Sequence, residues 1–156
     1  MNKKSNKICC VTGHRNIPNV KCSYVAEQLA KEIESAIAGG FNYFISGFAD
    51  GTDLIFAKEI VNRIRNGQEL FLEAAIPYAG RLDSKDPVFQ DCLTYCSQIH
   101  IASQKYEKNC FLDRNMNMLQ KSQRVIAVYD RRKRGGTLYT INRAHCLDRD
   151  VRMIRI

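Results

Sequence analysis

The segment RVIAVYDRRKRGGTLYTINRAHCL, residues 124–147, places an apolar run, a polar turn and a helical pattern in direct succession. Residues 124–129 are almost continuously apolar, which is typical of a parallel strand buried on both faces. Gly135 and Gly136 end the polar turn, and the helix expected after them leads to a last apolar run at residues 151–156. A strand, a helix and a strand in this order form a βαβ unit, so the segment predicts a parallel sheet.

The same alternation extends back to the start of the chain. Apolar runs of strand length occupy residues 7–12, 41–45, 70–76 and 98–102. Helical patterns lie between them, at about residues 25–37, 54–64, 87–96 and 109–121. Pro77 is expected to stop the third strand. The chain is therefore expected to form a three-layer α/β domain over residues 1–156, with a mostly parallel sheet and helices on both faces.

Composition and charge narrow the class of protein. The chain is 45% hydrophobic and 26% charged, as globular proteins are, and carries a formal net charge of +8. Residues 79–156 hold 15 Lys and Arg against 8 Asp and Glu, which predicts an anionic partner: a phosphorylated small molecule, a nucleic acid or an acidic protein. No signal-peptide pattern or membrane-spanning run is present, so a cytoplasmic location without membrane contact is expected.

The seven cysteines form no CxxC pair and have no histidine at metal-ligand spacing. They are expected to be buried or half-buried thiols that behave as small apolar side chains. No metal and no cofactor are therefore predicted, and zinc remains the minor alternative.

Three of the expected strands are followed by turns that contain glycine. The turns are Thr12-Gly13-His14-Arg15, SGFADGTD (residues 46–53) and Gly135-Gly136-Thr137. Ligands of open α/β sheets bind beyond the carboxyl ends of the strands, and helix N-termini favour phosphate. Glycine also lets a ligand approach the backbone closely. The patterns GxGxxG and GxxxxGK[ST] are both absent, which disfavours conventional NAD binding and P-loop chemistry.

Four segments of the chain form a more specific pattern together. They are CCVTGHR (residues 9–15), SGFADGTD, IPYAGR (residues 76–81) and RNMNMLQKSQRVIAVYDRRKRGGTLYTINRA (residues 114–144). In this order they resemble the YpsA-like family of the SLOG superfamily. That superfamily contains Rossmann-like domains related to the Lonely Guy phosphoribohydrolases and to the DNA-processing protein DprA. The resemblance implies a strand order near 3-2-1-4-5 and a pocket for a nucleotide or a nucleotide derivative.

The resemblance also assigns residues to that pocket. It implies a wall of Thr12, Gly13, His14 and Arg15 and a second wall of Ser46, Gly47, Gly51 and Asp53. It also implies a phosphate cradle of Gly135, Gly136 and Thr137, with Tyr139 and Thr140 one turn further on. Arg114 and Asn115 are expected to project from the preceding helix. From the residues alone, Asp50 and Asp53 either cap the next helix or contact the ligand, Asp53 by accepting from a ribose hydroxyl or holding a catalytic water. Residues 131–134 (RRKR) either form a solvated loop or give the pocket mouth a positive field.

One departure from the related enzymes concerns catalysis. The phosphoribohydrolases carry a PGGxGTxxE motif whose glutamate takes part in cleaving the N-glycosidic bond, and Thr140 stands about where that glutamate would be. A threonine cannot act as a carboxylate base or stabilise an oxocarbenium ion. The sequence therefore leaves enzymatic activity open and identifies no catalytic residue.

Three functions are compatible with these features. The first is a binding module that senses or sequesters a nucleotide-derived ligand of the ADP-ribose type. The second is a nucleotide hydrolase acting on an N-glycosidic or phosphoester bond, in which Asp50, Asp53 or Glu73 replaces the missing glutamate. The third is nucleic-acid binding as in DprA, which is less favoured because the sequence lacks a basic stripe interleaved with aromatic residues. The superfamily also suggests a homo-oligomer.

Overall fold

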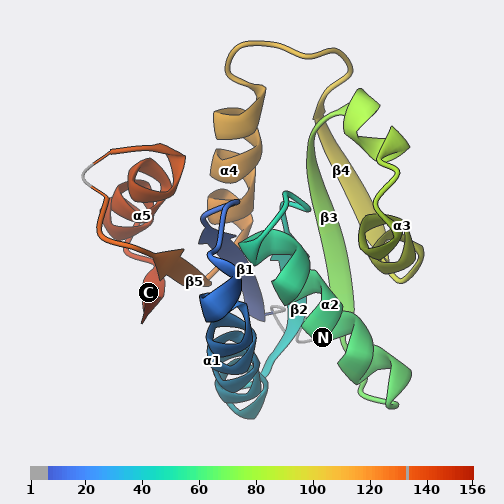
Figure 1. Cartoon of the computed structure of the whole chain (residues 1–156), viewed down its shortest axis with the longest axis vertical. Helices are drawn as coiled ribbons and strands as arrows, with labels where there is room; N and C mark the ends of the chain where they lie inside the picture. Colours follow the sequence, from blue (N-terminus) through green and yellow to red (C-terminus); the bar gives the residue numbers. More distant parts are fainter. Residues whose placement is uncertain (1–6, 133) are drawn as a thin grey trace, which may run out of the picture.

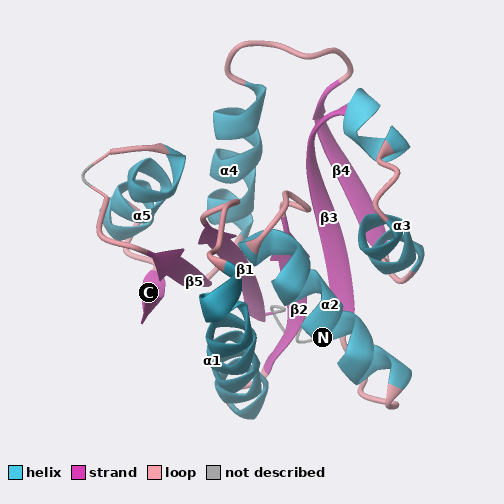
Figure 2. Cartoon of the chain, viewed as in Figure 1, coloured by secondary structure: helices cyan, strands magenta, loops and turns pink. Residues whose placement is uncertain are grey.

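The computed structural model describes residues 7–132 and 134–156, and its described strands form one parallel sheet (Figures 1 and 2). The strands are β1 (Lys7–Gly13), β2 (Phe41–Ser46), β3 (Phe71–Tyr78), β4 (Gln98–Ser103), β5 (Arg124–Tyr129) and β6 (Asp150–Arg155). Their spatial order is β4-β3-β2-β1-β5-β6, and each neighbouring pair is parallel. The predicted α/β fold with a parallel sheet is confirmed.

Helices cover both faces of the sheet, as the three-layer prediction requires. The helices are α1 (Asn19–Ala38), α2 (Thr52–Arg65), α3 (Pro87–Thr94), α4 (Cys110–Lys121) and α5 (Gly136–Cys146), with a short 3₁₀ helix η1 (Ala79–Asp83) after β3. Buried side chains of α1, α2 and α3 share one apolar cluster, which includes Leu29, Ile60 and Phe89. Residues of α4 and α5, such as Leu119 and Ala144, pack in a second cluster on the opposite face.

The strand order differs from the expected order near 3-2-1-4-5 in the place of one strand. The succession 3-2-1 and the reversal beside β1 are present, but β5 lies next to β1, and β4 extends the sheet beyond β3. Helix α3 packs against α2 on the same face as α1. A right-handed crossover on that face adds each new strand in the same direction, which carries β4 outward.

The end of β3 also differs from the sequence-based expectation. Pro77 is expected to stop this strand, yet β3 continues to Tyr78. The register pairs Ile76 and Tyr78 with β4 and passes over Pro77, while β2 ends opposite Ala74. The missing N–H of proline therefore interrupts no ladder at this edge, and its ring is tolerated.

The direction in which successive strands are added to the sheet reverses between β1 and β5. From β1 the chain crosses by α1 to β2, and from β5 it crosses by α5 to β6 on the other side. The loops that follow these two strands therefore diverge and leave a crevice at the carboxyl end of the sheet. None of the helices in the described part of the chain is long and apolar enough to cross a membrane.

Candidate functional site

A cavity of about 300 Å³ lies at this point of reversal. Its walls come from the end of β1, the first half of α4 and the loop that leads from β5 into α5. The residues predicted from the sequence that line it are Thr12, Gly13, His14, Arg15, Asp53, Arg114, Asn115, Gly135, Gly136 and Thr137. The structure thus brings together three turns and a helix that are far apart in the sequence.

A second cavity of about 250 Å³ adjoins the first and shares Arg15, Ala49, Phe111 and Arg114 with it. It holds two more predicted residues, Gly47 and Asp50. Ser46, Gly51 and Tyr139 are also predicted pocket residues, but they line neither cavity. Ser46 is fully buried, whereas the Tyr139 side chain on α5 is 46% exposed.

Two of the glycine turns pack against each other rather than against open space. The loops after β1 and β2 lie side by side (Figure 2), and the Thr52 N–H and Oγ1 both donate to the carbonyl of His14, at 3.2 and 3.0 Å. A Cβ on Gly13 would lie 2.4 Å from Thr52 Oγ1, and one on Gly51 would lie 2.2 Å from the Arg15 carbonyl oxygen. The absence of these side chains is explained by contact between the two loops.

The third turn is different because it faces open space. Gly135 adopts φ 119° and ψ 174°. Apart from adjacent residues and the backbone of α5, no described atom lies within 4 Å of a Cβ placed on Gly135 or Gly136. Helix α5 begins at Gly136 without a side-chain cap and without an acidic residue in its first turn. Its first N–H groups and the positive end of its dipole are therefore available to an anion in the cavity.

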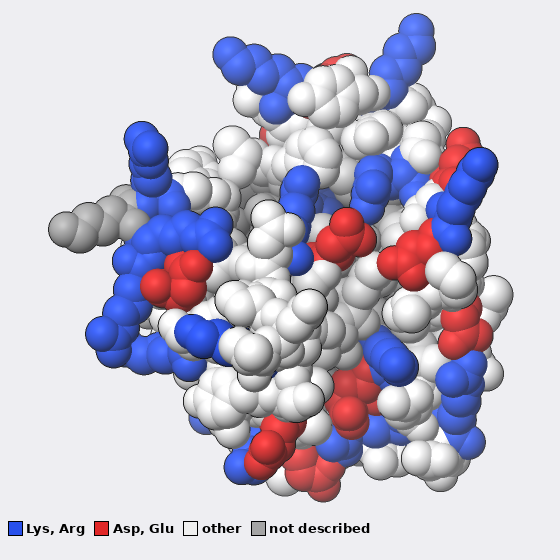
Figure 3. Space-filling view, in the orientation of Figure 1, with Lys and Arg blue, Asp and Glu red and all other residues white. Residues whose placement is uncertain are grey.

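Arginines add positive charge to the mouth of this cavity. Arg132 and Arg134 line it, and Figure 3 shows Lys and Arg side chains gathered over the β5–α5 loop and α5. Arg131 is exposed, and Lys133, which belongs to the same basic run, lies outside the described residues. Part of this basic run therefore borders the cavity, so it is more than a solvated loop.

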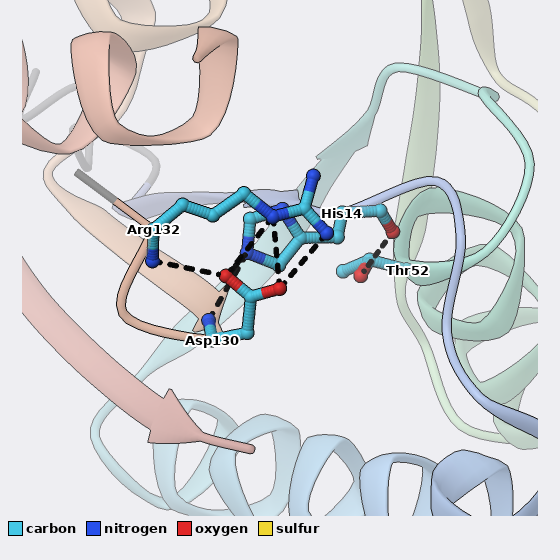
Figure 4. A network of polar contacts seen from close by, with 4 residues as sticks. All are labelled: His14, Thr52, Asp130 and Arg132. Atoms are coloured by element: carbon cyan, nitrogen blue, oxygen red, sulfur yellow. Dashed lines mark hydrogen bonds and ion pairs between the residues drawn. The ribbon is translucent and has the colours of Figure 1, made fainter. Parts of the chain in front are cut away.

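His14 ties the end of β1 to the end of β5 (Figure 4). Its Nε2 lies 3.0 Å from the backbone nitrogen of Asp130 and 3.0 Å from Asp130 Oδ1, and Asp130 in turn pairs with Arg132 at 2.8 Å. Burial lowers the pKa of His14, and the Asp130 carboxylate opposes this shift only in part. A neutral imidazole either accepts from the N–H or donates to the carboxylate. His14 therefore holds the β5–α5 loop in place while it lines the cavity.

Arg114 crosses the interior between the two cavities. The side chain is only 4% exposed, and its Nη1 donates to the carbonyl oxygens of Gly47 at 2.6 Å and Ala75 at 3.3 Å. Its Nε donates to Asn115 Oδ1 at 2.7 Å. Arg114 thus fixes the loop after β2 to α4, and it presents a buried positive charge to both cavities.

Thr140 is buried and lies one turn after the start of α5. It is 3% exposed, and its hydroxyl donates to the Gly136 carbonyl at 2.8 Å and accepts from Asn115 Nδ2 at 3.1 Å. Neither cavity is lined by Thr140. At this position the side chain stabilises the turn and offers no acid or base to the cavity.

The three carboxylates that could replace the missing glutamate lie in different places. Asp53, near the start of α2, lines the first cavity and is 8% exposed. Asp50 lines the second cavity. Glu73 on β3 lines neither cavity, and its two oxygens accept hydrogen bonds from Tyr43 and Lys121. Glu73 therefore belongs to a buried structural network, and the hypothesis of a base at that position has no support in the geometry.

Asp53 is the carboxylate with the most perturbed environment. Burial raises the pKa of Asp53 to about 6, although the charge of Arg114 and a hydrogen bond from the Ala49 N–H act in the opposite direction. The side chain thus changes protonation state close to neutral pH. This is the range in which a carboxyl group can exchange a proton with a ligand.

This shift predicts a pH dependence of stability that depends on Asp53. The folded-state pKa lies above the usual value of 3.8, so the folded chain binds the proton more tightly than the unfolded chain does. The contribution of Asp53 to stability is therefore full below about pH 4 and falls by up to about 3 kcal/mol as the pH rises through 6. Urea unfolding of wild type and Asp53→Asn at pH 4.5 and 7.5 measures this difference. A wild-type protein whose stability changes with pH just as the variant's does would contradict the assignment.

Sequence reasoning missed several residues that line the cavities. Phe111 and Leu112 look like ordinary apolar residues of a helix, and nothing in their spacing marks them. Tyr78 and Arg81 lie in the IPYAGR segment, which carried part of the family resemblance. Their place at the carboxyl end of β3, beside the ends of β1 and β2, is the signal that could have identified them.

The described part of the chain contains no cluster of metal-binding side chains. Among residues 7–132 and 134–156, no group of three or more His, Cys, Asp or Glu side chains is placed to hold a metal ion. All seven cysteines are free thiols, and Cys9, Cys10, Cys92 and Cys110 are buried. Burial raises the pKa of Cys10 to about 12, which makes this thiol unreactive.

The fold and the cavities together define a Rossmann-like α/β protein with a crevice at its topological switch point that is lined in part by arginines. A family model described as the YspA SLOG family, YpsA, matches residues 9–153, and the chain belongs to this family. The resemblance expected from the four sequence segments is thereby confirmed.

Two solved structures share the fold. One is DNA processing protein A from Helicobacter pylori, described for its single-stranded DNA binding mode, with a TM-score of 0.65 and 19% identity over 96% of this chain and 65% of that chain. The chain therefore spans about two thirds of the length of that protein. The other is TM1055, a structural-genomics target, with a TM-score of 0.59 and 16% identity over 93% of this chain and 72% of that chain. A search of the curated proteins found no match.

Proposed function

We propose that this chain binds a nucleotide-derived ligand of the ADP-ribose type and senses or sequesters it without turning it over. The observation that carries the proposal is the first turn of α5, where Gly135 and Gly136 leave open space at an uncapped helix N-terminus. Arg132 and Arg134 border the same cavity. Backbone N–H groups, a helix dipole and guanidinium groups are the donors that bind phosphate oxygens in proteins.

The support for binding without turnover is the arrangement of the acidic residues. Thr140 stands where the related hydrolases have their glutamate, and its hydroxyl is engaged by Asn115 and Gly136. The first cavity is lined by one carboxylate, Asp53, in the described part of the chain. A lone carboxylate accepts a hydrogen bond from a ribose hydroxyl when it is ionised, which fits a binding role.

A second candidate function is nucleotide hydrolysis with Asp53 as the acid or base. The observation in its favour is the pKa of Asp53, which burial raises to about 6. In that case Asp53→Asn abolishes turnover, and Asp50→Asn, at the second cavity, leaves the rate within about twofold. If both variants keep the wild-type rate, this candidate is excluded.

A thermal-shift screen tests the proposal. The ligands are AMP, ADP, ADP-ribose, NAD, cyclic nucleotides and short single-stranded oligonucleotides, and each bound ligand is then recovered and chromatographed. We expect ADP-ribose at about 100 times its Kd to stabilise the fold by about 2.7 kcal/mol, which raises Tm by roughly 5–10 °C, and to be recovered intact.

The other outcomes of the screen separate the alternatives. Recovery of ribose phosphate or free base identifies an enzyme. Stabilisation by oligonucleotides alone, with an affinity that falls steeply with salt, supports the nucleic-acid function of the DprA type. No shift with any nucleotide at millimolar concentration would contradict nucleotide binding altogether.

A further inference from the structure

The second cavity has a composition unlike that of the first. It lies beyond the ends of β2 and β3, between the β2–α2 loop, η1 and the start of α4. Its wall contains two aromatic rings, Tyr78 and Phe111, together with Arg15, Arg81 and Arg114. The glycine turn that opens α5 takes no part in it, so this cavity lies outside the proposed phosphate site.

The aromatic rings belong to a cluster assembled from two segments, the end of β3 and the stretch formed by the loop before α4 and the start of α4. The Tyr78 ring centroid lies 5.5 Å from that of Tyr106 and 6.2 Å from that of Phe111, and both pairs meet edge to face. Tyr106, in the loop before α4, is 65% exposed. Exposed aromatic rings beside guanidinium groups are the surfaces on which nucleic-acid bases stack.

Arg15 and Phe111 form the boundary between the two cavities. The Arg15 guanidinium carbon lies 4.7 Å from the centroid of the Phe111 ring, and both residues line both cavities. Arg15 is exposed, and its guanidinium lies over the Phe111 ring. A ligand that enters the first cavity therefore meets the second directly across a stacked arginine.

The sizes of the cavities indicate a ligand with two parts. Pockets for drug-sized ligands measure about 300–1,000 Å³. The two cavities measure about 300 and 250 Å³, so each alone lies at or below the lower end of that range. Their combined volume lies well within it, which favours one ligand that occupies both. An anionic group suits the first cavity, and a planar aromatic group suits the second.

From these observations we infer that the second cavity is a base-binding subsite, in which Tyr78 and Phe111 receive the nucleobase of a ligand whose phosphates lie at the first turn of α5. The inference rests on the proposed function, because it assumes that phosphate binds in the first cavity. It adds the place of the base, so that the ligand is recognised by its base as well as by its phosphates. Arg81 then lies beside the base, where its guanidinium can stack on the π surface of the base or donate a hydrogen bond to one of its acceptor atoms.

The test compares ligands with and without a base by titration calorimetry. The probes are ADP-ribose, pyrophosphate and ribose 5-phosphate, and the variants are Tyr78→Leu, Arg81→Met and the conservative Tyr78→Phe. Wild type is expected to bind ADP-ribose roughly 5- to 150-fold more tightly than pyrophosphate, as stacking of one base permits. Tyr78→Leu is expected to remove most of this preference while the affinity for pyrophosphate stays within about twofold, and Tyr78→Phe is expected to keep it.

The controls separate failure of the subsite from failure of the proposed function. Tyr24→Leu, which replaces a 47% exposed tyrosine on α1, should change neither affinity. The base subsite is overturned if wild type binds ADP-ribose and pyrophosphate with equal affinity. It is also overturned if Tyr78→Leu weakens the binding of both ligands equally. In either case the proposal that wild type binds phosphate still stands. Absence of pyrophosphate and ADP-ribose binding in wild type overturns the proposed function. If Tyr78→Leu weakens binding of single-stranded oligonucleotides but not of ADP-ribose, the aromatic cluster serves nucleic acid and the inference is wrong.

Discussion

Replacement of Gly51 by alanine is expected to lower the free energy of unfolding by about 2–5 kcal/mol. Gly51 has φ 74°, and a Cβ at this position would lie 2.2 Å from the Arg15 carbonyl oxygen and 2.7 Å from the His14 carbonyl oxygen. Both obstacles are backbone atoms, so relief requires the loops after β1 and β2 to separate. The hydrogen bonds from Thr52 to the His14 carbonyl would lengthen at the same time.

Gly67 provides a matched control for this substitution. It also has a positive φ, 92°, but no described atom beyond its two chain neighbours would lie within 4 Å of a Cβ at this position. Gly67→Ala should therefore cost only the backbone strain, about 1–2 kcal/mol. Urea unfolding of both variants at one pH measures the difference. Equal losses of stability would show that contact between the two loops is not what requires glycine at position 51.

Replacement of Gly136 by valine is expected to weaken binding of ADP-ribose by about 100-fold or more. Two isopropyl methyl groups would occupy the open space at the first turn of α5 and block hydrogen bonds from its N–H groups to a phosphate, each worth about 1.5–3 kcal/mol. The fold should tolerate the change, because no described atom beyond the adjacent residues and the α5 backbone lies within 4 Å of the new Cβ. Calorimetric titration measures the affinity, and thermal unfolding checks the fold.

Tyr139→Ala serves as the control on the same helix. The family resemblance implies that this tyrosine contacts the ligand one turn beyond the phosphate cradle, but its side chain is exposed and lines neither cavity. The affinity for ADP-ribose should therefore stay within about threefold of wild type. A large loss in Tyr139→Ala together with an unaffected Gly136→Val would place the ligand on the outer face of α5 and contradict the proposed site.

The sequence predicted the fold class because each strand and each helix carries its own pattern. The continuous apolar run of β5 and the four-residue spacing of Val25, Leu29 and Ile33 are local signals, and these three helix residues are buried as expected. The position of β4 beyond β3 has no local signal, since it depends on which face α3 covers. Pro77 is a local signal that predicts the end of β3. The strand nevertheless continues to Tyr78, because the pairing with β4 passes over Pro77.

The sequence predicted part of the lining of the two cavities, and the glycine turns show why it could not predict all of it. A glycine in a turn indicates that something approaches the backbone closely, but the sequence does not say what. At Gly13 and Gly51 the approaching atoms belong to the chain itself, whereas Gly136 faces an open cavity. Phe111 lines both cavities, yet it looks like any apolar helix residue, because its role depends on the loops that face it.

The central claim is that a nucleotide phosphate binds at the first turn of α5, and amide chemical shifts test it most directly. A two-dimensional ¹H–¹⁵N spectrum of the uniformly labelled protein is recorded during titration with ADP-ribose. We expect the largest shifts at the amides of Gly136 and Thr137, with smaller ones at Gly13 and His14 across the cavity, and no shift at Tyr24 on α1. Saturation with ADP-ribose that leaves Gly136 and Thr137 unmoved, while signals elsewhere shift, would contradict the claim.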